Sequence, residues 1–399
     1  MTIPGSARAP VRPHKPKILV FVGGYLPGYR FGGPLQSIAN LVDRLGDEFD
    51  FRIVTADRDL GSTAPYPDIV PQQWHPVGQA QVLYLAPAER RLAVISRILR
   101  ETPHHALYLN SFFNPHFSTL PLVARRMGRS PLTARVILAP RGEFAPGALQ
   151  IKQSKKRVFL AISRLVALHR NLIWQASTQR EADDIRRATG PGNIVCATDL
   201  PRQPAPLLAR RPRAAGEPLR IVFLSRISPM KNLLYALEAL AEVKAPVVFT
   251  IHGPREDEGY WQDCAAVIAR MPSNIEIVEG GPVEPADVVP ALAQHDLFFL
   301  PTQGENYGHV IGEALEAGLR ILISDRTPWR GLAAEDVGDD LPLGARSAFV
   351  QAIEQAAARR DRIEAAERSY AFLAKAFDVA DTLEANRMLL ASALPRDVG

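Results

Sequence analysis

The sequence has only two cysteines and no long apolar run, and each shortage excludes a class of protein. Cys196 and Cys264 allow neither a disulfide framework nor a cysteine metal cluster, so we expect a reducing, cytoplasmic environment. No apolar run approaches the ~20 residues that a membrane-spanning helix needs.

The start of the chain also lacks two familiar patterns. The first apolar stretch, 18–22, leads into glycines rather than a cleavage-like site, so it predicts a buried strand behind a loose tail over 1–16. The following residues, 23–27, read GGYLP instead of G-x-G-x-x-G, which argues against a Rossmann dehydrogenase.

The remaining composition is typical of a folded protein with two domains. Hydrophobic residues make up 47% and charged residues 22% of the chain, whereas a disordered chain has fewer apolar residues and more charge. A length of 399 residues suits two domains of about 200 residues each. The net charge of +5 is unevenly divided, since residues 1–200 carry +12 and the rest −7. Either the basic half faces an anionic partner or charge simply drifts between domains.

Short apolar strands alternate with helical patterns, which predicts parallel βαβ units and a doubly wound α/β fold. A segment with five prolines, 201–218, separates two such series and predicts a linker. We expect two Rossmann-like domains, 17–200 and 219–375, facing each other across a cleft, with a helix over 376–399 packing back on the first. The predicted strands are 17–22, 51–55, 82–85, 106–109, 136–138 and 173–175, then 220–225, 247–252, 275–278, 297–300 and 320–324.

The most specific motif, TQGENYGHVIGEA over 302–314, follows the strand 297–300. It runs into a helix, so backbone N–H groups around 307–310 lie at a helix N-terminus, which favours an anion such as a pyrophosphate. Glu305 and Glu313 could accept hydrogen bonds from hydroxyl groups of a sugar or ribose. From the spacing alone, two incidental glutamates on a solvated helix face remain an equal alternative.

A second motif, FLSRISPMKN over 223–232, ends the first strand of the second series. The strand end carries Arg226, and Lys231 opens the next helix. Two cations at one strand end can clamp a diphosphate and neutralise charge on a departing nucleotide. In isolation, two surface cations beside a turn are an equally good interpretation.

Taken together, a strand with R-x4-K, a strand with P-T-x-G-E-x7-E-A-x3-G and an N-terminal glycine turn resemble the retaining glycosyltransferases of family 4. These are the group 1 glycosyl transferases of the GT-B fold, and the resemblance covers residues 17 to about 385. It implies transfer of a sugar from a nucleotide-diphosphate sugar to a glycan or lipid-linked glycan, with retention of anomeric configuration. The sequence P-R-G at 140–142 further resembles a subgroup associated with bacterial surface polysaccharide.

The resemblance also implies roles for single residues in donor binding. It assigns the diphosphate to Arg226 and Lys231, the ribose to Glu313 and the donor sugar to Glu305. Backbone groups would contact the sugar and phosphate at Tyr307, Gly308 and His309, the base at Gly281 and Val283, and the phosphate from the first domain at Gly33.

The resemblance is incomplete in the first domain. Family members commonly carry a histidine near the reacting carbon where this chain has Arg141. Arginine stays protonated and cannot act as a base, but it could bind a donor or acceptor anion with Glu143 beside it. An Arg–Glu pair that braces the loop is the alternative. Asn110 and Ser111, at the end of another strand, are predicted on the acceptor side.

No metal, organic cofactor or nucleic-acid partner is expected. The sequence Asp57-Arg58-Asp59 matches the D-x-D signature of the other major glycosyltransferase fold. That fold has no second Rossmann half, so we expect a structural role in a loop. The reaction that the resemblance implies is a front-face displacement in which the leaving phosphate takes the acceptor's proton. A nucleotide-sugar epimerase or hydrolase of the same fold, or an inactive nucleotide-sugar-binding protein, remains the alternative.

The segment 152–170 combines basic and apolar residues at helical spacing. Basic amphipathic helices can lie on an anionic membrane, which favours peripheral attachment to the inner face of the cell membrane. An ordinary domain helix with a solvated basic face is equally compatible with the pattern.

Overall fold

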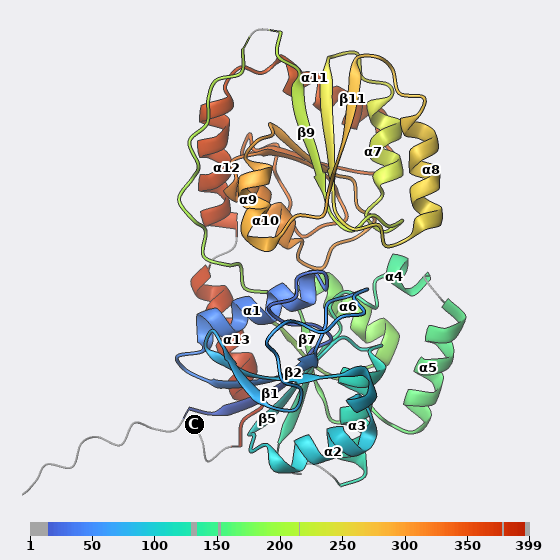
Figure 1. Cartoon of the computed structure of the whole chain (residues 1–399), viewed down its shortest axis with the longest axis vertical. Coiled ribbons are helices and arrows are strands. Elements are labelled where there is room, and N and C mark those ends of the chain that lie inside the picture. Colours follow the sequence, from blue (N-terminus) through green and yellow to red (C-terminus); the bar gives the residue numbers. More distant parts are fainter. Residues whose placement is uncertain (1–14, 129–133, 151–152, 215, 377–378, 396–399) are drawn as a thin grey trace, which may run out of the picture.

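The computed structural model describes the chain except for residues 1–14, 129–133, 151–152, 215, 377–378 and 396–399. Two sheets of mainly parallel strands, each flanked by helices, lie one above the other along the long axis of the molecule (Figure 1). This arrangement confirms the doubly wound, two-domain fold that the sequence predicts.

The first sheet has eight strands in the order β3-β4-β2-β1-β5-β6-β7-β8, and only the β3–β4 pair is antiparallel. The strands are β1 (Lys17–Phe21), β2 (Asp50–Ala56), β3 (Trp74–Val77), β4 (Ala80–Leu85), β5 (Ala106–Asn110), β6 (Arg135–Ala139), β7 (Ile173–Ala176) and β8 (Asn193–Cys196). Sequence patterns did not predict β3 and β8. Both are partly exposed edge strands, so they lack the continuous apolar run of a strand that is buried on both faces.

Two separate cores cover the two faces of the first sheet. Ile18 and Val20 of β1 belong to one core, and the alternate residues Leu19 and Phe21 belong to the other, as the two-residue period of a strand requires. The helices of this domain are α1 (Gly33–Leu45), α2 (Leu92–Glu101), α3 (Leu120–Arg126), α4 (Pro146–Gln150), α5 (Gln153–Leu165) and α6 (Gln179–Thr189).

The second sheet has six parallel strands in the order β11-β10-β9-β12-β13-β14. They are β9 (Leu219–Leu224), β10 (Val247–His252), β11 (Ile275–Gly281), β12 (Leu297–Leu300), β13 (Arg320–Ser324) and β14 (Gly338–Leu341). The sequence did not predict β14, because this edge strand reads GDDL and has no apolar run. The flanking helices are α7 (Leu233–Leu240), α8 (Glu258–Ile268), α9 (Val288–Leu292), α10 (His309–Glu316), α11 (Arg346–Ala358) and α12 (Arg362–Ala376).

The chain crosses between the domains at the linker and again before the last helix. That helix, α13 (Val379–Ser392), lies beside the first domain, and its Leu389 and Leu390 belong to the core that contains α1 (Figure 1). Three short helical turns, Pro87–Glu89, Pro115–Thr119 and Pro285–Asp287, complete the helical elements. Within the described ranges, no helix has the length and apolar character to cross a membrane.

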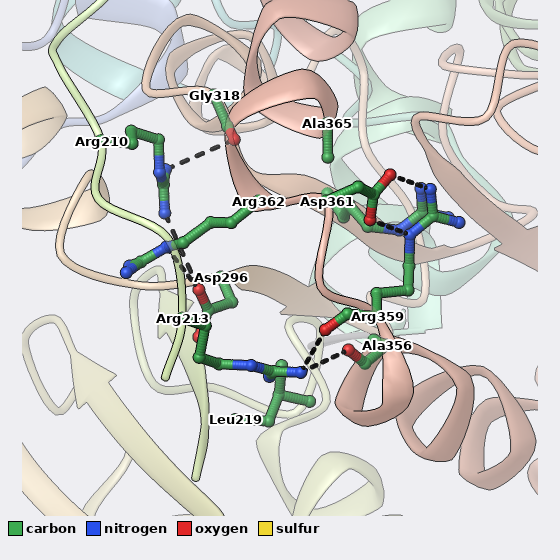
Figure 2. A pocket seen from close by; sticks show the side chains of 11 residues that line it. Arg210, Arg213, Leu219, Asp296, Gly318, Ala356, Arg359, Asp361, Arg362 and Ala365 are labelled. Carbon is green, nitrogen blue, oxygen red and sulfur yellow. Dashed lines mark hydrogen bonds and ion pairs between the residues drawn. The ribbon is translucent and has the colours of Figure 1, made fainter. Parts of the chain in front are cut away.

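The proline-rich linker is fastened to the second domain by its arginines (Figure 2). Arg210 donates to the carbonyl oxygens of Ala317 and Gly318, just after α10, at 2.9 and 3.3 Å. Arg213 donates to the carbonyl oxygens of Ala356 and Arg359 at the end of α11. Cations are favourable at helix C-termini, where carbonyl groups lack partners within the helix. The linker is therefore part of the second domain's packed surface rather than a free tether.

Candidate active site

The two domains enclose a cavity of about 1010 Å³ at the carboxyl ends of their strands. This is where ligands bind in open parallel sheets. Gly281, Asn110 and Ser111 do not line the cavity. The predicted site residues that do line it are Gly33, Arg141, Glu143, Arg226, Lys231, Val283, Glu305, Tyr307, Gly308, His309 and Glu313.

The start of α10 forms the floor of the cavity in the second domain. Gly308 precedes the helix with φ of 80°, a conformation that only glycine adopts without strain. A Cβ atom at this position would lie 2.9 Å from the Cδ1 atom of Ile311. Trp329 Nε1 donates to the carbonyl oxygen of Tyr307 at 2.7 Å and so holds the preceding turn. The first turn of α10 therefore borders the cavity with His309 and Val310, where backbone N–H groups of a helix N-terminus favour an anion.

Glu313 projects from α10 without a hydrogen-bond partner among the residues that the structure describes. Burial raises its pKa to about 7, which Arg202 opposes and the nearby carboxylate of Glu316 reinforces. A carboxylate in this position is poorly solvated until a ligand supplies hydrogen-bond donors. A hydroxyl pair would serve this purpose.

The two cations of the second motif lie at the same cavity and already have acidic partners. Lys231 forms an ion pair with Glu305, and Arg226 forms one with Glu256 at 2.7 Å. Backbone contacts join the two motifs, since Gln303 N donates to the carbonyl oxygen of Met230 at 2.8 Å. The loops after β9 and β12 thus form one unit, which carries both charges of the Lys231–Glu305 pair.

The predicted base-binding loop is only partly at the cavity. Val283 lines it, but Gly281 does not. Gly281 ends β11 with φ of 68°, and its carbonyl oxygen accepts from Gly253 N at 2.9 Å. That Gly281 contacts the base stays a prediction, since only its carbonyl oxygen is seen to be used in the sheet.

The first domain contributes Gly33 at the start of α1 and three direct hydrogen bonds to segment 301–309 of the second domain, here called the donor loop. Ser37 Oγ lies 3.2 Å from His309 Nε2. The amide of Asn306, oriented to satisfy both neighbours, donates to Glu181 Oε2 at 2.7 Å and accepts from Ser177 Oγ at 2.8 Å. The two domains that enclose the cavity are therefore in direct contact beside it.

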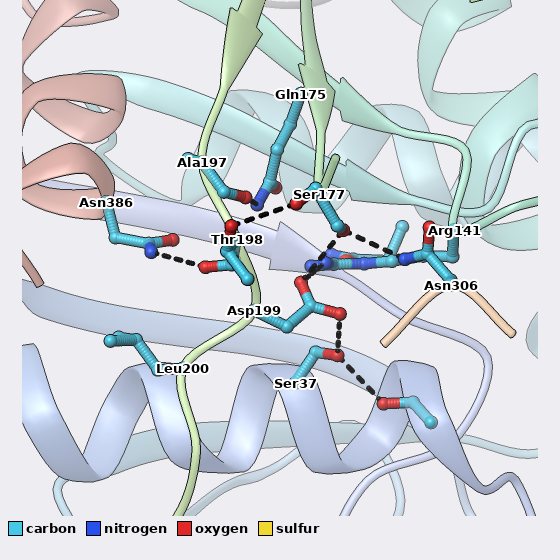
Figure 3. Close-up of polar contacts among 12 residues, drawn as sticks. Ser37, Arg141, Gln175, Ser177, Ala197, Thr198, Asp199, Leu200, Asn306 and Asn386 are labelled. Atoms are coloured by element: carbon cyan, nitrogen blue, oxygen red, sulfur yellow. Dashed lines mark hydrogen bonds and ion pairs between the residues drawn. The ribbon is translucent and has the colours of Figure 1, made fainter. Parts of the chain in front are cut away.

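Arg141 lines the cavity and is also bound to other residues of the first domain (Figure 3). Its side chain is only 5% exposed and forms a buried ion pair with Asp199. The remaining guanidinium nitrogens donate to Asn110 Oδ1 and to the Tyr108 hydroxyl, at 2.8–3.2 Å. Burial disfavours the charge, but Asp199, Tyr108 and Glu181 together leave the pKa of Arg141 above its ordinary value. Since Arg141 lines the cavity, its binding of a substrate anion stays a prediction.

Asn110, Ser111 and Glu143 support the loops instead of facing an acceptor. Asn110 is fully buried and accepts from Arg141. Glu143 accepts from Ser111 Oγ at 2.6 Å and from Phe112 N and Phe113 N. Among the described residues Arg141 and Glu143 do not pair with each other, since Arg141 pairs with Asp199 and Glu143 accepts from the loop after β5. Of these three acceptor-side candidates, only Glu143 borders the cavity.

The D-x-D sequence is occupied by loop contacts. Asp57 forms ion pairs with Arg58 at 2.8 Å and Arg90 at 3.3 Å. Asp59 accepts from the backbone N–H groups of Tyr29 and Arg30 at 3.0–3.2 Å. These contacts agree with the predicted structural role of the motif.

Four polar residues at the domain contact were not predicted. They are Ser37, Asp199, Glu181 and Asn306. Only Asn306 lies inside a recognised motif, and none of the others carries a spacing signal of its own. Their partners come from segments distant in the sequence, which no local pattern reveals.

Comparisons with known proteins agree with this geometry. Residues 218–359 match the family described as "Glycosyl transferases group 1". HepE of Anabaena, solved with UDP and glucose, is 15% identical with a TM-score of 0.65, over 94% of this chain and 99% of that chain. Sucrose-phosphate synthase of Thermosynechococcus elongatus is 12% identical with a TM-score of 0.66, over 95% and 100%. WaaG, "a glycosyltransferase involved in lipopolysaccharide biosynthesis", is 14% identical with a TM-score of 0.60, over 93% and 99%. A search of curated sequences finds no match.

The fold and the cavity thus define an enzyme of the two-domain GT-B class. The chain is a glycosyltransferase, and residues 218–359 of its second domain match the model of the group 1 glycosyl transferases.

Proposed function

We propose that this glycosyltransferase moves a sugar from a nucleoside diphosphate sugar to an acceptor hydroxyl, with retention of anomeric configuration. The observation that carries the proposal is the set of complementary groups on one cavity wall. The Glu313 carboxylate offers an acceptor to a ribose diol, the start of α10 offers N–H groups to a pyrophosphate, and Arg226 and Lys231 offer positive charge. HepE was solved with UDP-glucose, which makes this sugar nucleotide the first donor to test.

The side chains around the cavity support a displacement without an enzymatic base. Arg141 stays cationic, and Glu305 is paired with Lys231. We infer that the acceptor oxygen bonds to the anomeric carbon on the face from which the nucleoside diphosphate leaves. The acceptor's proton passes to the departing phosphate oxygen, so the bond to the acceptor forms as the bond to the diphosphate breaks. The enzyme contributes position and charge stabilisation.

The outer surface of α5 supports a membrane-bound acceptor. This helix lies at the edge of the first domain (Figure 1). Lys155, Arg157 and Arg164 are exposed beside an apolar stripe on the same segment. Lys152 lies outside the described residues. The stripe consists of Val158, Ile162, Leu165 and Val166, which are 58%, 56%, 86% and 56% exposed.

A stripe with this spacing lies along one side of a helix, and no other part of the described chain covers it. Apolar side chains flanked by cations suit the headgroup region of an anionic bilayer. We propose that the first domain attaches to the inner face of the cell membrane, where a lipid-linked glycan acceptor is presented.

The test of the proposed donor is a thermal-shift screen against a panel of nucleotide sugars, followed by NMR of the product's anomeric centre. A ligand at 100 times its dissociation constant stabilises the fold by about 2.7 kcal/mol. We expect one donor to stand out and its anomeric configuration to be retained. Release of free sugar in the presence of glycan acceptors would indicate a hydrolase, and an inverted product would contradict the front-face mechanism.

A further inference from the structure

A chain of polar contacts runs from the donor loop of the second domain into the core of the first. It begins at the His309 ring and passes Ser37 on α1. From Ser37 it continues through Asp199, before the linker, to Arg141 (Figure 3). Ser37 and Asp199 are each 4% exposed, so both groups are largely buried beside the cavity. Neither residue belongs to the motifs that bind the donor.

The direction of the hydrogen bonds follows from the groups around Ser37 Oγ. Two of them can only accept, namely Asp199 Oδ2 at 2.8 Å and the carbonyl oxygen of Gly33 at 2.9 Å. A hydroxyl group has one proton, and Ser37 donates it to these two acceptors rather than to His309. The third neighbour, His309 Nε2 at 3.2 Å, must then be the donor. The protonated ring nitrogen of His309 is therefore Nε2.

The ring of His309 is neutral when it makes this contact. Burial lowers its pKa to about 4, although the carboxylate of Asp199 opposes the shift and Arg141 reinforces it. Arg141 balances the charge of Asp199, which therefore stays available as an acceptor for Ser37. The Arg141 guanidinium also donates to the Tyr108 hydroxyl and to Asn110 Oδ1, which fix its position.

Arg141 itself is held in an uncommon backbone conformation, with φ of 56°. The left-handed region strains a non-glycine residue, and such strain is typical of functional sites. Here it coincides with a side chain whose three guanidinium nitrogens each donate within the protein. Arg141 thus acts as a fixed anchor for Asp199.

We propose that Ser37 and Asp199 are positioning residues that hold His309, and with it the first turn of α10, against the first domain. His309 begins α10, so its ring orientation is coupled to the N–H groups that face the cavity. The inference rests on the proposed function, in which these groups bind the donor diphosphate. Domain contact then completes the donor site through one hydrogen bond from His309 Nε2 to Ser37.

The first test needs no turnover. Ring-nitrogen NMR of histidine-labelled full-length protein at pH 7 should show His309 with its proton on Nε2, assigned by loss of the signal in His309→Gln. In Ser37→Ala, the His309 ring signals should shift or average between the two tautomers. The matched control is Ser163→Ala, since Ser163 is also a buried helical serine of the first domain but donates to Leu160 within its own helix. An Nδ1-protonated ring in the wild type, or unchanged His309 signals in Ser37→Ala, would overturn the proposal.

The second test separates binding from chemistry. We expect Ser37→Ala to raise the KM for the donor about tenfold, the loss expected for one buried hydrogen bond, with kcat changed by roughly twofold or less. Ser37→Thr keeps the hydroxyl and should recover most of the affinity. Asp199→Asn, checked for an unchanged thermal unfolding profile, should behave like Ser37→Ala. Equal loss in Ser37→Ala and Ser37→Thr would overturn the proposal, whereas wild-type protein that binds no nucleotide sugar would count against the proposed function alone.

Discussion

At the scale of single residues, the two glutamates of the E-x7-E motif differ in what surrounds them. Glu305 is paired with Lys231, whereas Glu313 has no hydrogen-bond partner in the described part of the chain and carries a raised pKa. Lys231 thus balances the charge of the Glu305 carboxylate, whereas the Glu313 carboxylate is available to a ligand. Their contributions to binding and to transfer should therefore separate.

Removal of Glu313 should weaken nucleotide binding, and removal of Glu305 should mainly damage transfer. A hydrogen bond to a charged group contributes roughly 1.5–3 kcal/mol, so Glu313→Ala should lose about tenfold to a hundredfold in affinity for the nucleoside diphosphate. Lys231→Ala should lose affinity in the same range, because it removes charge at the diphosphate. Calorimetry with the nucleotide measures the first two effects, and turnover measures Glu305→Ala. Unchanged affinity in folded Glu313→Ala protein would reject the ribose assignment.

The raised pKa of Glu313 also predicts how stability changes with pH. The folded protein holds this proton up to about pH 7, whereas an unfolded glutamate releases it near 4.5. Between these values the folded state binds more protons, so this group makes stability fall as pH rises. Glu313→Gln should therefore melt close to the wild type at pH 5 and at a higher temperature at pH 8. A variant that is less stable than the wild type at pH 8 would contradict the assignment.

At the scale of elements, the turn into α10 depends on one glycine. Gly308→Ala forces a side chain into the left-handed region, at a cost of about 1–2 kcal/mol, and places its Cβ against Ile311. We expect a matching loss in the free energy of unfolding and weaker nucleotide binding, because the N–H groups of the first turn move. Chemical denaturation and calorimetry measure the two effects.

Gly304 provides the control for this substitution. It lies in the same loop, and a Cβ there would come no closer than 4.0 Å to the Met230 sulfur. Gly304→Ala should leave the free energy of unfolding nearly unchanged. Equal destabilisation by both substitutions would show that the loop, rather than the backbone conformation of Gly308, sets the stability.

At the scale of the whole molecule, the charges that face the diphosphate come from side chains and helix N-termini. Arg226 and Lys231 line the cavity from one domain, and Gly33 begins α1 on the other side. Asp57 and Asp59 are engaged in loop contacts. We therefore expect turnover to persist in EDTA. Loss of turnover in EDTA that manganese restores would refute a metal-independent reaction.

The surface of α5 predicts salt-sensitive binding to anionic membranes. Each Lys or Arg near such a surface contributes about 1 kcal/mol, and the attraction decays within a Debye length of about 8 Å at physiological salt. Replacing Lys155 and Arg157 by glutamate, together with Leu165→Ser, should abolish sedimentation with liposomes that contain anionic lipid. Lys156 is left unchanged, because its ammonium group donates to Ala148 and lies over the Phe113 ring.

The control for the membrane prediction carries the same change of charge on the other domain. Lys244 and Lys375 are exposed there, and their replacement by glutamate should leave liposome binding intact. Equal sedimentation with neutral and anionic liposomes, or equal loss in both variants, would remove the case for α5 as the attachment surface.

Local patterns in the sequence were sufficient for most of the fold and for much of the second-domain wall of the cavity. The strands β10, β12 and β13 coincide with their predicted ranges, because a strand buried on both faces must be continuously apolar. The motifs around Lys231 and Glu305 were recognisable for a similar reason. Each motif consists of a strand end, a loop and the start of a helix within a few residues. A contiguous stretch of sequence therefore contains all of its functional side chains.

Contacts between distant segments were beyond such reasoning. Arg141 pairs with Asp199, 58 residues further along the chain, because the loops after β6 and β8 meet above one sheet edge. Ser37 reaches His309 across 272 residues, because the two domains close on each other. The sequence alone therefore predicted which residues bind a donor, and most of them line one cavity. The partner of each buried charge depended on which strand ends are neighbours in space, since an ion pair or hydrogen bond requires a distance that no local pattern encodes.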